Sequence, residues 1–343
     1  MHWKLFDGER EEWNKIILDS KAHYRQSYNW GEYKSLMSWQ ILRLKKISKD
    51  GEVQLVQITY RKFLSFCAAY IPGNISGDIN LLDNDFRKAL IKFTHSRFIY
   101  IRLDSNSKEF MKERSILKKN GWKKPLQSLH VSRSIDCEID NIEDRISNGS
   151  KSWRRNYKKS LKTYDEKNIN IKISNEPNFS DLVSISSEMG RNKKIINIHS
   201  IEEFSNLTKS MPDQSIFATA YGSSQNPLAY RGMIYLRGKA WDFGAASTKE
   251  GRNLMASYVL TIELLKKAKK LGVKTYNFGG VDPKRHQGVY KFKSGIESTE
   301  YTYTGEWEWS NLFLVRLIIN PLIFIMMSDK VRKSFKFINN YKF

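Results

Sequence analysis

The side chains best suited to metal or covalent chemistry are scattered along this 343-residue chain. Its six histidines stand at positions 2, 23, 95, 130, 199 and 286, and no two of them have the spacing of metal ligands. Two cysteines, Cys67 and Cys137, are too few for a disulfide framework or a cysteine zinc site, and they indicate a reducing compartment. Motifs for a serine nucleophile, a phosphate loop and a dinucleotide-binding loop are missing from the sequence. We therefore expect neither a metal nor a cofactor.

Transfer of an acyl group to an amine needs none of these groups, because a deprotonated amine is itself a nucleophile. An enzyme of this kind must mainly orient its two substrates and stabilise the oxyanion of the tetrahedral intermediate. The sequence therefore favours acyl transfer without a covalent intermediate. It leaves open a protein without catalytic activity that binds RNA or a membrane.

The charge of the chain indicates an anionic partner. Lysine and arginine number 58 against 36 acidic residues, a formal charge of +22. Residues 151–170 contain seven of the basic residues, interleaved with Trp153, Tyr157 and Tyr164, and residues 266–293 contain nine. Basic residues among aromatic ones suit RNA, through phosphate contacts and base stacking, and they equally suit anionic lipid. The sequence does not choose between the two.

Strand-like and helix-like segments alternate along the chain, which predicts an α/β or α+β fold. Helices are expected at about 83–94 and 256–271, the second with an apolar face, a lysine-rich last turn and Gly272 at its end. The strongest strand candidates are residues 53–60, 98–102, 169–173, 216–220, 228–236 and 274–278. The order of hairpin, helix and strand recurs about 175 residues apart, so the chain reads as two related halves with a junction near residues 140–152.

Six short motifs, in order, resemble those of the FemABX family, the aminoacyl-tRNA-dependent peptidyltransferases that build interpeptide bridges in bacterial peptidoglycan. The resemblance covers about residues 25–307. The six matching segments are Trp30–Lys34, Tyr100–Asp104, Trp153–Asn156, Glu188–Arg191, Gly244–Tyr258 and Tyr276–Gly295.

This resemblance implies two GNAT-like N-acyltransferase domains in tandem, without the coiled-coil arm of some members. The first domain would comprise residues 1–145, completed by residues 296–343, and the second residues 146–295. The implied activity moves an amino acid from aminoacyl-tRNA to an amine of a cell-wall precursor, a phosphate-bearing muropeptide or a lipid-linked relative. A cytoplasmic location follows from the donor, and the first residues show no apolar signal segment.

The resemblance also implies roles for two residues of the first half. Lys34 matches a lysine expected to hold the diphosphate of the acceptor, which suits a compact ammonium group. Asp104 matches a carboxylate that accepts a proton from the incoming amine or orients it. Without the resemblance, Lys34 reads as a surface charge and Asp104 as a helix cap.

In the second half, Lys293 matches a lysine at the junction of the two substrates, where a cation stabilises the oxyanion, and Phe292 packs beside it. By itself Lys293 reads as a solvated strand lysine. Tyr258 could donate to a carbonyl or stack on the terminal adenosine of the tRNA, although core packing is the commoner role. Arg191 matches a position near the acceptor site. His199 stands where compact members carry a second arginine, and this leaves the identity of the acceptor open.

The basic segment at the start of the second half is expected to contact tRNA. Its residues in this role are Trp153, Arg154, Arg155, Lys158 and Lys159. The alternative function is an acyl-CoA-dependent GNAT N-acyltransferase that acts on an amino sugar of a surface polysaccharide. GNAT enzymes bind pyrophosphate through a glycine-rich loop, and here Met255 and Ser257 stand where small flexible residues are needed. This departure favours tRNA over coenzyme A.

Residues 312–327 form the one membrane-like stretch. It is too short to span a bilayer, and Arg316, Asn320 and Pro321 interrupt it. Either a buried terminal helix or an interfacial helix fits, and the basic residues that follow, Lys330 to Lys336, favour peripheral contact with the inner membrane surface. The sequence does not indicate an oligomeric state.

Overall fold

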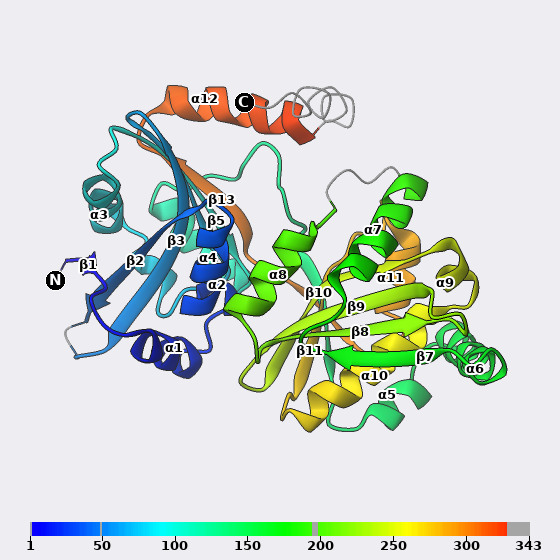
Figure 1. Cartoon of the computed structure of the whole chain (residues 1–343). Coiled ribbons are helices and arrows are strands. Elements are labelled where there is room, and N and C mark those ends of the chain that lie inside the picture. Colours follow the sequence, from blue (N-terminus) through cyan, green and yellow to red (C-terminus); the bar gives the residue numbers. More distant parts are fainter. Residues whose placement is uncertain (1, 49, 194–197, 328–343) are drawn as a thin grey trace. The chain divides into compact units, whose positions relative to one another are not determined.

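The computed structural model describes residues 2–48, 50–193 and 198–327, and it divides into two compact units (Figure 1). The first unit runs to residue 132 and resumes at residue 302, and the second comprises residues 133–301. From the sequence we expected these divisions near 145 and 296. The first division lies earlier because strand β6 (Arg133–Glu138) pairs with β11 (Thr275–Gly280) in the second sheet.

In the first unit, the strands form a sheet in the order β1-β2-β3-β4-β5-β13. Strands β4 and β5 are parallel and the other neighbours are antiparallel. The strands are β1 (Lys4–Leu5), β2 (Gln40–Ile47), β3 (Val53–Phe63), β4 (Phe66–Pro72), β5 (Phe98–Ser105) and β13 (Gly305–Ser310). The helices are α1 (Arg10–Asp19), α2 (Tyr28–Leu36), α3 (Asn84–Thr94), α4 (Phe110–Lys119) and α12 (Phe313–Met327), with short 3-10 turns η1 (Tyr24–Gln26) and η2 (Ile79–Leu81).

Helix α3 shows how the sequence sets an element of this unit. The Asp83 carboxylate accepts from the backbone amides of Asp85 and Phe86, which otherwise have no partner at a helix start. Phe86 and Leu90 then face the core, one turn apart. Helix α3 connects β4 to its parallel neighbour β5, since parallel strands need a crossover of this kind.

The second unit contains a sheet in the order β12-β6-β11-β10-β9-β8-β7. Here β10 and β11 are the parallel pair. The strands other than β6 and β11 are β7 (Asn170–Ser174), β8 (Ser215–Tyr221), β9 (Pro227–Leu236), β10 (Lys239–Ser247) and β12 (Thr299–Thr302). The helices are α5 (Ile142–Ser147), α6 (Lys151–Glu166), α7 (Phe179–Lys193), α8 (Ile201–Ser210), α9 (Lys249–Asn253), α10 (Ala256–Lys270) and α11 (Gln287–Lys293).

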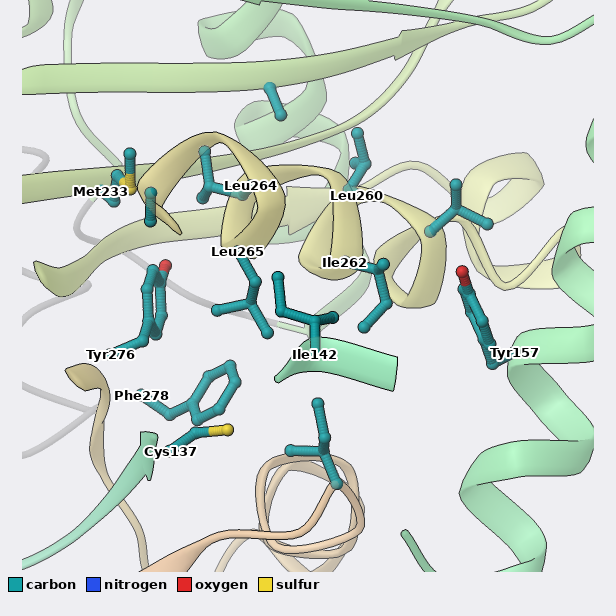
Figure 2. Close-up of a cluster of buried hydrophobic side chains, with 14 of the residues drawn as sticks. Cys137, Ile142, Tyr157, Met233, Leu260, Ile262, Leu264, Leu265, Tyr276 and Phe278 are labelled. Carbon is teal, nitrogen blue, oxygen red and sulfur yellow. The ribbon is translucent and has the colours of Figure 1, made fainter. Parts of the chain in front are cut away.

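Helix α10 packs across this second sheet and organises its core (Figure 2). Leu260, Leu264 and Leu265 of the helix are fully buried, and so are Tyr276 and Phe278 of β11. The expected helices and strands are therefore present in both units. The longest described helix, α6, has 16 residues, so the described residues contain no coiled-coil arm.

Helix α12 belongs to the first unit and packs on β5 and β13. Among the residues that the structure describes, no helix is long and apolar enough to cross a membrane. The basic run Lys330 to Lys336 lies outside the described residues.

Candidate active site

Lys293 is the last residue of α11, so it lies on a helix rather than on a strand. Its side chain is half-buried, and Nζ donates to the carbonyl oxygen of Gly280 at 3.1 Å. Burial lowers the pKa of the Lys293 ammonium, and Arg231 adds to that effect, whereas Asp242 opposes it. The ammonium is thus held at the end of β11 by a backbone carbonyl rather than by a carboxylate.

The two parallel strands beside Lys293 separate after a short paired stretch. Their register runs from Lys239 opposite Thr275 to Trp241 opposite Asn277. Strand β10 then bulges between Asp242 and Ala245 in its pairing with β9. Gly244 lies in this bulge with φ of +79°, in the left-handed region that glycine adopts without strain. Beyond the paired stretch, the carbonyl end of β11 is therefore not occupied by β10.

A buried ion pair lies next to Lys293. The Arg231 guanidinium contacts both oxygens of Asp242, with Nε 2.8 Å from Oδ1 and Nη2 2.9 Å from Oδ2. The Tyr276 hydroxyl donates to the same carboxylate at 3.0 Å, and burial, followed by Asp242, raises the pKa of Tyr276 well above its usual value. Because a buried charge is costly unless it is paired, this arrangement stabilises the charges beside Lys293.

The sequence reasoning did not identify Arg231, Asp242 or Tyr276. A usable signal was present, since Arg231 and Asp242 interrupt strands whose neighbouring residues are apolar or aromatic. Charged residues in the middle of buried strands must find each other or another partner. Their pairing across β9 and β10, however, depends on a register that the sequence does not state.

Three aromatic residues gather around the end of α11. The rings of Tyr258 and Phe292 meet edge to face with their centres 5.0 Å apart, and the centre of the Trp153 ring lies 5.3 Å from that of Tyr258. Asn156 donates to the Tyr258 hydroxyl at 3.0 Å. The Trp153 indole donates to the Phe292 carbonyl at 3.0 Å, which ties α6 to α11. The structure thus brings together four residues named from the sequence, namely Trp153, Tyr258, Phe292 and Lys293.

Helix α6 separates its aromatic and basic residues on different faces. Trp153 is only 1% exposed, so in this structure it is a core residue and offers no surface for base stacking. Tyr157 and Tyr164 are buried as well. The remaining residues expected to bind tRNA are all exposed: Arg154, Arg155, Lys158 and Lys159. The helix therefore presents a basic face, suited to phosphate contacts without stacking.

Arg191 lies near the end of α7 with an exposed side chain. His199 forms an ion pair with Glu203 at 3.3 Å when protonated, and its ring stacks on Phe243 at 5.6 Å. Phe243 belongs to the bulged part of β10. His199 therefore lies against the bulge, whereas no contact in the described residues connects Arg191 to Lys293.

In the first unit, Asp104 lies near the end of β5 and is buried. The Tyr70 hydroxyl donates to its Oδ2 at 3.2 Å, and Arg25 Nη1 lies 3.7 Å from the same atom. Burial and Asp104 raise the pKa of Tyr70 well above its usual value. Asp104 is not a helix cap, since Glu109 occupies the cap position of α4.

Lys34 is linked to Arg25 and Asp104 by the ring of Trp30. Its Nζ is 5.1 Å from the centre of the Trp30 ring, and the Arg25 guanidinium is 5.9 Å from the same ring. Two cations therefore share one indole, which attracts them through its negative face. Arg25 was not named from the sequence. It connects Lys34 to Asp104 because it contacts both Trp30 and the carboxylate.

The two cysteines have unreactive surroundings. Burial raises the pKa of the Cys67 thiol to about 11 and that of Cys137 to about 12. Neither provides a thiolate near neutral pH. Within the described residues, no cluster of three or more histidine, cysteine or acidic side chains could hold a metal ion.

The chain resembles known proteins in part of its sequence and in its fold. Residues 151–311 match the model of the FemAB family. The matched residues, which resemble the FemAB family, make up most of the second unit. The match begins with α6 and includes Lys293, Arg231 and Asp242, whereas Lys34 and Asp104 precede it. No curated protein matches the chain.

Solved structures show the same fold at low sequence identity. FemX matches with a TM-score of 0.78 and 16% identity, over 93% of this chain and 100% of that one. L-PGS from Bacillus licheniformis has a TM-score of 0.54 and 11% identity, over 92% and 97%. A tandem GNAT protein from the clavulanic acid biosynthesis pathway has a TM-score of 0.55 and 9% identity, over 90% and 98%. The expected tandem GNAT-like architecture is confirmed, and with the family it indicates a transferase of the acyl or aminoacyl class.

Proposed function

We propose that this chain transfers an amino acid from aminoacyl-tRNA to an amine of a cell-wall precursor. The observation that carries the proposal is Lys293 at the open end of β11, inside the region that matches the FemAB family. Its ammonium is close to the aromatic side chains of Tyr258 and Phe292 and to the buried ion pair of Arg231 and Asp242. The thiols of Cys67 and Cys137 stay protonated near neutral pH, because burial raises their pKa. This setting suits electrostatic stabilisation and offers no covalent cysteine intermediate.

In the proposed reaction, the acceptor amine attacks the ester carbonyl that joins the amino acid to the terminal adenosine of the tRNA. A carbon–nitrogen bond forms and the carbon–oxygen ester bond breaks. The amine loses a proton, and the departing ribose oxygen gains one. Lys293 would stabilise the negative charge on the carbonyl oxygen of the tetrahedral intermediate.

The first unit would serve the acceptor. Lys34 and Arg25 lie against one indole and supply two positive charges, which suits a diphosphate. Asp104 would accept or orient the amine proton, and Tyr70 and Arg25 hold its carboxylate in place. Arg191 would contribute to the acceptor side of the second unit. These roles rest on the family resemblance together with the contacts observed within each unit.

The donor would be held by the exposed basic face of α6. Arg154, Arg155, Lys158 and Lys159 project from successive turns of one helix, which suits contacts to successive phosphates. An aminoacyl-tRNA donor also places the reaction in the cytoplasm. Tyr258 would contact the end of the tRNA next to Phe292.

The alternative is an N-acyltransferase that uses acyl-CoA and an amino sugar, and the loop before α10 does not favour it. Short helix α9 occupies this loop, and the amides of Gly251, Arg252, Leu254 and Met255 all donate to atoms within it. Amides already bonded in this way are not available to cradle a pyrophosphate. Met255 caps α10 in a left-handed conformation, with its side chain where a glycine would leave space.

The test is a transfer assay with a charged tRNA pool in which each amino acid is labelled in turn. Acceptors are a nucleotide-linked and a lipid-linked muropeptide, and acetyl-CoA with amino sugars replaces the donor in a parallel assay. We expect label in the muropeptide only with charged tRNA, and loss of transfer in Lys293→Met. Acetyl transfer to an amino sugar without transfer from tRNA would instead establish the alternative.

A further inference from the structure

Helix α12 in the first unit is amphipathic in the opposite sense to an ordinary surface helix. Its outward side chains are apolar, and their exposed fractions are large: Phe313 63%, Leu314 65%, Leu317 51%, Ile318 61% and Leu322 47%. The spacing of these residues, in pairs one turn apart, places them on one face. A helix of a globular protein normally buries its apolar face, whereas the apolar face of α12 is not covered by any of the described residues.

The polar face of α12 is the one fixed to the unit. Arg316 donates to the carboxylate of Glu308 and, at 3.0 Å, to the carbonyl of Lys124. Asn320 donates to the same carboxylate at 2.9 Å. Glu308 is fully buried on β13 and needs these partners, because an unpaired buried carboxylate is costly. The polar docking of Arg316 and Asn320 therefore directs the apolar face outward.

Further exposed apolar residues lie at the same end of the first unit. The β3–β4 turn carries Phe63, 75% exposed, and Leu64, 80% exposed. The next residue, Ser65, accepts from the amide of Arg97, whose carbonyl accepts from Asn311 just before α12. Figure 1 shows this turn and the start of α12 at one edge of the unit. Turn and helix thus belong to one surface.

Basic residues border this apolar surface. Arg61 and Lys62 directly precede the turn. The Arg97 amide donates to Ser65 after it, and the backbone of Lys123 bonds to that of Glu308, the residue to which α12 is docked. All four basic side chains are exposed. The sequence continues with five lysines and arginines and no acidic residue between positions 330 and 343. An apolar face with a basic border matches the acyl chains and anionic headgroups of a lipid surface.

We propose that the outer face of α12 and the β3–β4 turn form a membrane-binding face that takes an anionic lipid bilayer surface. A second copy of the chain fits less well, because a two-fold contact would bring the two basic borders together. RNA fits less well because the outward residues of α12 carry no charge. The helix would lie in the plane of the interface. This inference does not depend on the proposed reaction.

The test measures binding of the full chain to vesicles by co-sedimentation. Equimolar phosphatidylglycerol and phosphatidylcholine vesicles should bind the protein, and pure phosphatidylcholine vesicles should bind it more weakly. Leu317→Glu combined with Ile318→Glu should lower the partition coefficient about tenfold or more. Phe63→Ser combined with Leu64→Ser should lower it by a smaller factor. Met111→Glu is the matched control, since Met111 is 71% exposed on α4, and it should leave binding unchanged.

Thermal unfolding of each variant checks the fold, and the pair Leu317→Ser and Ile318→Ser replaces any variant that unfolds early. The proposal is overturned if the α12 variants bind anionic vesicles as the original chain does. It is also overturned if sedimentation velocity shows a dimer that the α12 variants abolish, or if these variants lose RNA binding while the chain ignores vesicles. Since no substrate is present, these outcomes are independent of the transfer assay.

Discussion

Each unit contains one described pair of parallel strands, β4 with β5 in the first and β10 with β11 in the second, and the two pairs differ in how far they stay paired. In the first unit, β4 and β5 stay paired from Phe66 opposite Phe98 to Pro72 opposite Asp104. In the second, β10 and β11 stay paired only to Trp241 opposite Asn277, and β10 then bulges. One sheet is closed where the other opens. Since an open end exposes backbone carbonyls, that of Gly280 is available to anchor Lys293. In the first unit Lys124 donates to the carbonyls of Thr304 and Glu306 instead, at the start of β13.

Both units also contain a buried cluster of arginine, aspartate and tyrosine. Arg25, Asp104 and Tyr70 form it in the first, and Arg231, Asp242 and Tyr276 in the second. In the first cluster the Arg25 side chain is 29% exposed and its contact with the carboxylate is 3.7 Å long. In the second the Arg231 side chain is 5% exposed and its contacts are shorter. We infer that the first cluster can contact a substrate through the partly exposed Arg25. The second is closed to substrate and sets the electrostatic surroundings of Lys293.

The largest expected effect comes from the open end of the second unit. If Lys293 stabilises a charge present only in the transition state, Lys293→Met should lower kcat and kcat/KM together and leave KM nearly unchanged. Loss of one such donor costs about 3–4 kcal/mol, roughly a hundredfold to a thousandfold in rate. Steady-state kinetics measures this. Lys291→Met, an exposed lysine on the same helix, is the control.

A raised KM with kcat intact would instead assign Lys293 to substrate binding. If neither kcat nor KM changed, Lys293 would not be a catalytic residue. The difference between the open β10–β11 pair and the closed β4–β5 pair would then have no role in catalysis.

The next effect concerns the first cluster. Asp104→Asn keeps the shape of the side chain and removes its basicity, so kcat should fall about a hundredfold if the carboxylate handles the amine proton. Tyr70→Phe removes one hydrogen bond to Asp104 and should change kcat far less. If Asp104 only pairs with Arg25, Asp104→Asn should lower the thermal transition while kcat of the folded enzyme stays the same. Kinetics and thermal unfolding together separate the two roles.

A smaller effect is expected from the basic face of α6. Replacing Arg154, Arg155, Lys158 and Lys159 by glutamine should raise the Kd for tRNA about tenfold at moderate salt and flatten the dependence of log Kd on log salt. Four exposed lysines of the first unit, replaced in the same way, form the control: Lys108, Lys112, Lys118 and Lys119. Filter binding across a salt series measures both slopes. Equal losses in the two variants would mean that only the net charge matters.

The smallest effect at neutral pH is a change in pH dependence. Because burial lowers the pKa of Lys293, the ammonium loses its proton at lower pH than an ordinary lysine, and kcat should fall as pH rises through that lowered pKa. Lys293→Arg keeps the charge to higher pH, so the alkaline fall should move upward. The log kcat profile of the two enzymes shows this. An unchanged alkaline limb would assign it to another group.

The sequence alone predicts much of this fold, because local signals carry it. The helical pattern of residues 83–94 and the apolar face of residues 256–271 predict α3 and α10, and strand-like segments predict the strands that became β3, β5, β7, β8, β9 and β11. Motifs in order predict the family and, with it, the tandem halves. Lys293, Phe292 and Tyr258 could be named from motif positions, and the structure brings them together.

Tertiary structure decided the rest, because it depends on register and on which face a side chain takes. Trp153 belongs to a basic segment in the sequence, yet the packing of α6 buries it. The pairing of Arg231 with Asp242 follows from the alignment of β9 with β10, and the opening beside Lys293 follows from one bulge. The apolar run of α12 predicts a helix but not its orientation. Glu308, buried on a neighbouring strand, and the backbone of Lys124 and Leu126 bond to its polar face, so the apolar face points outward.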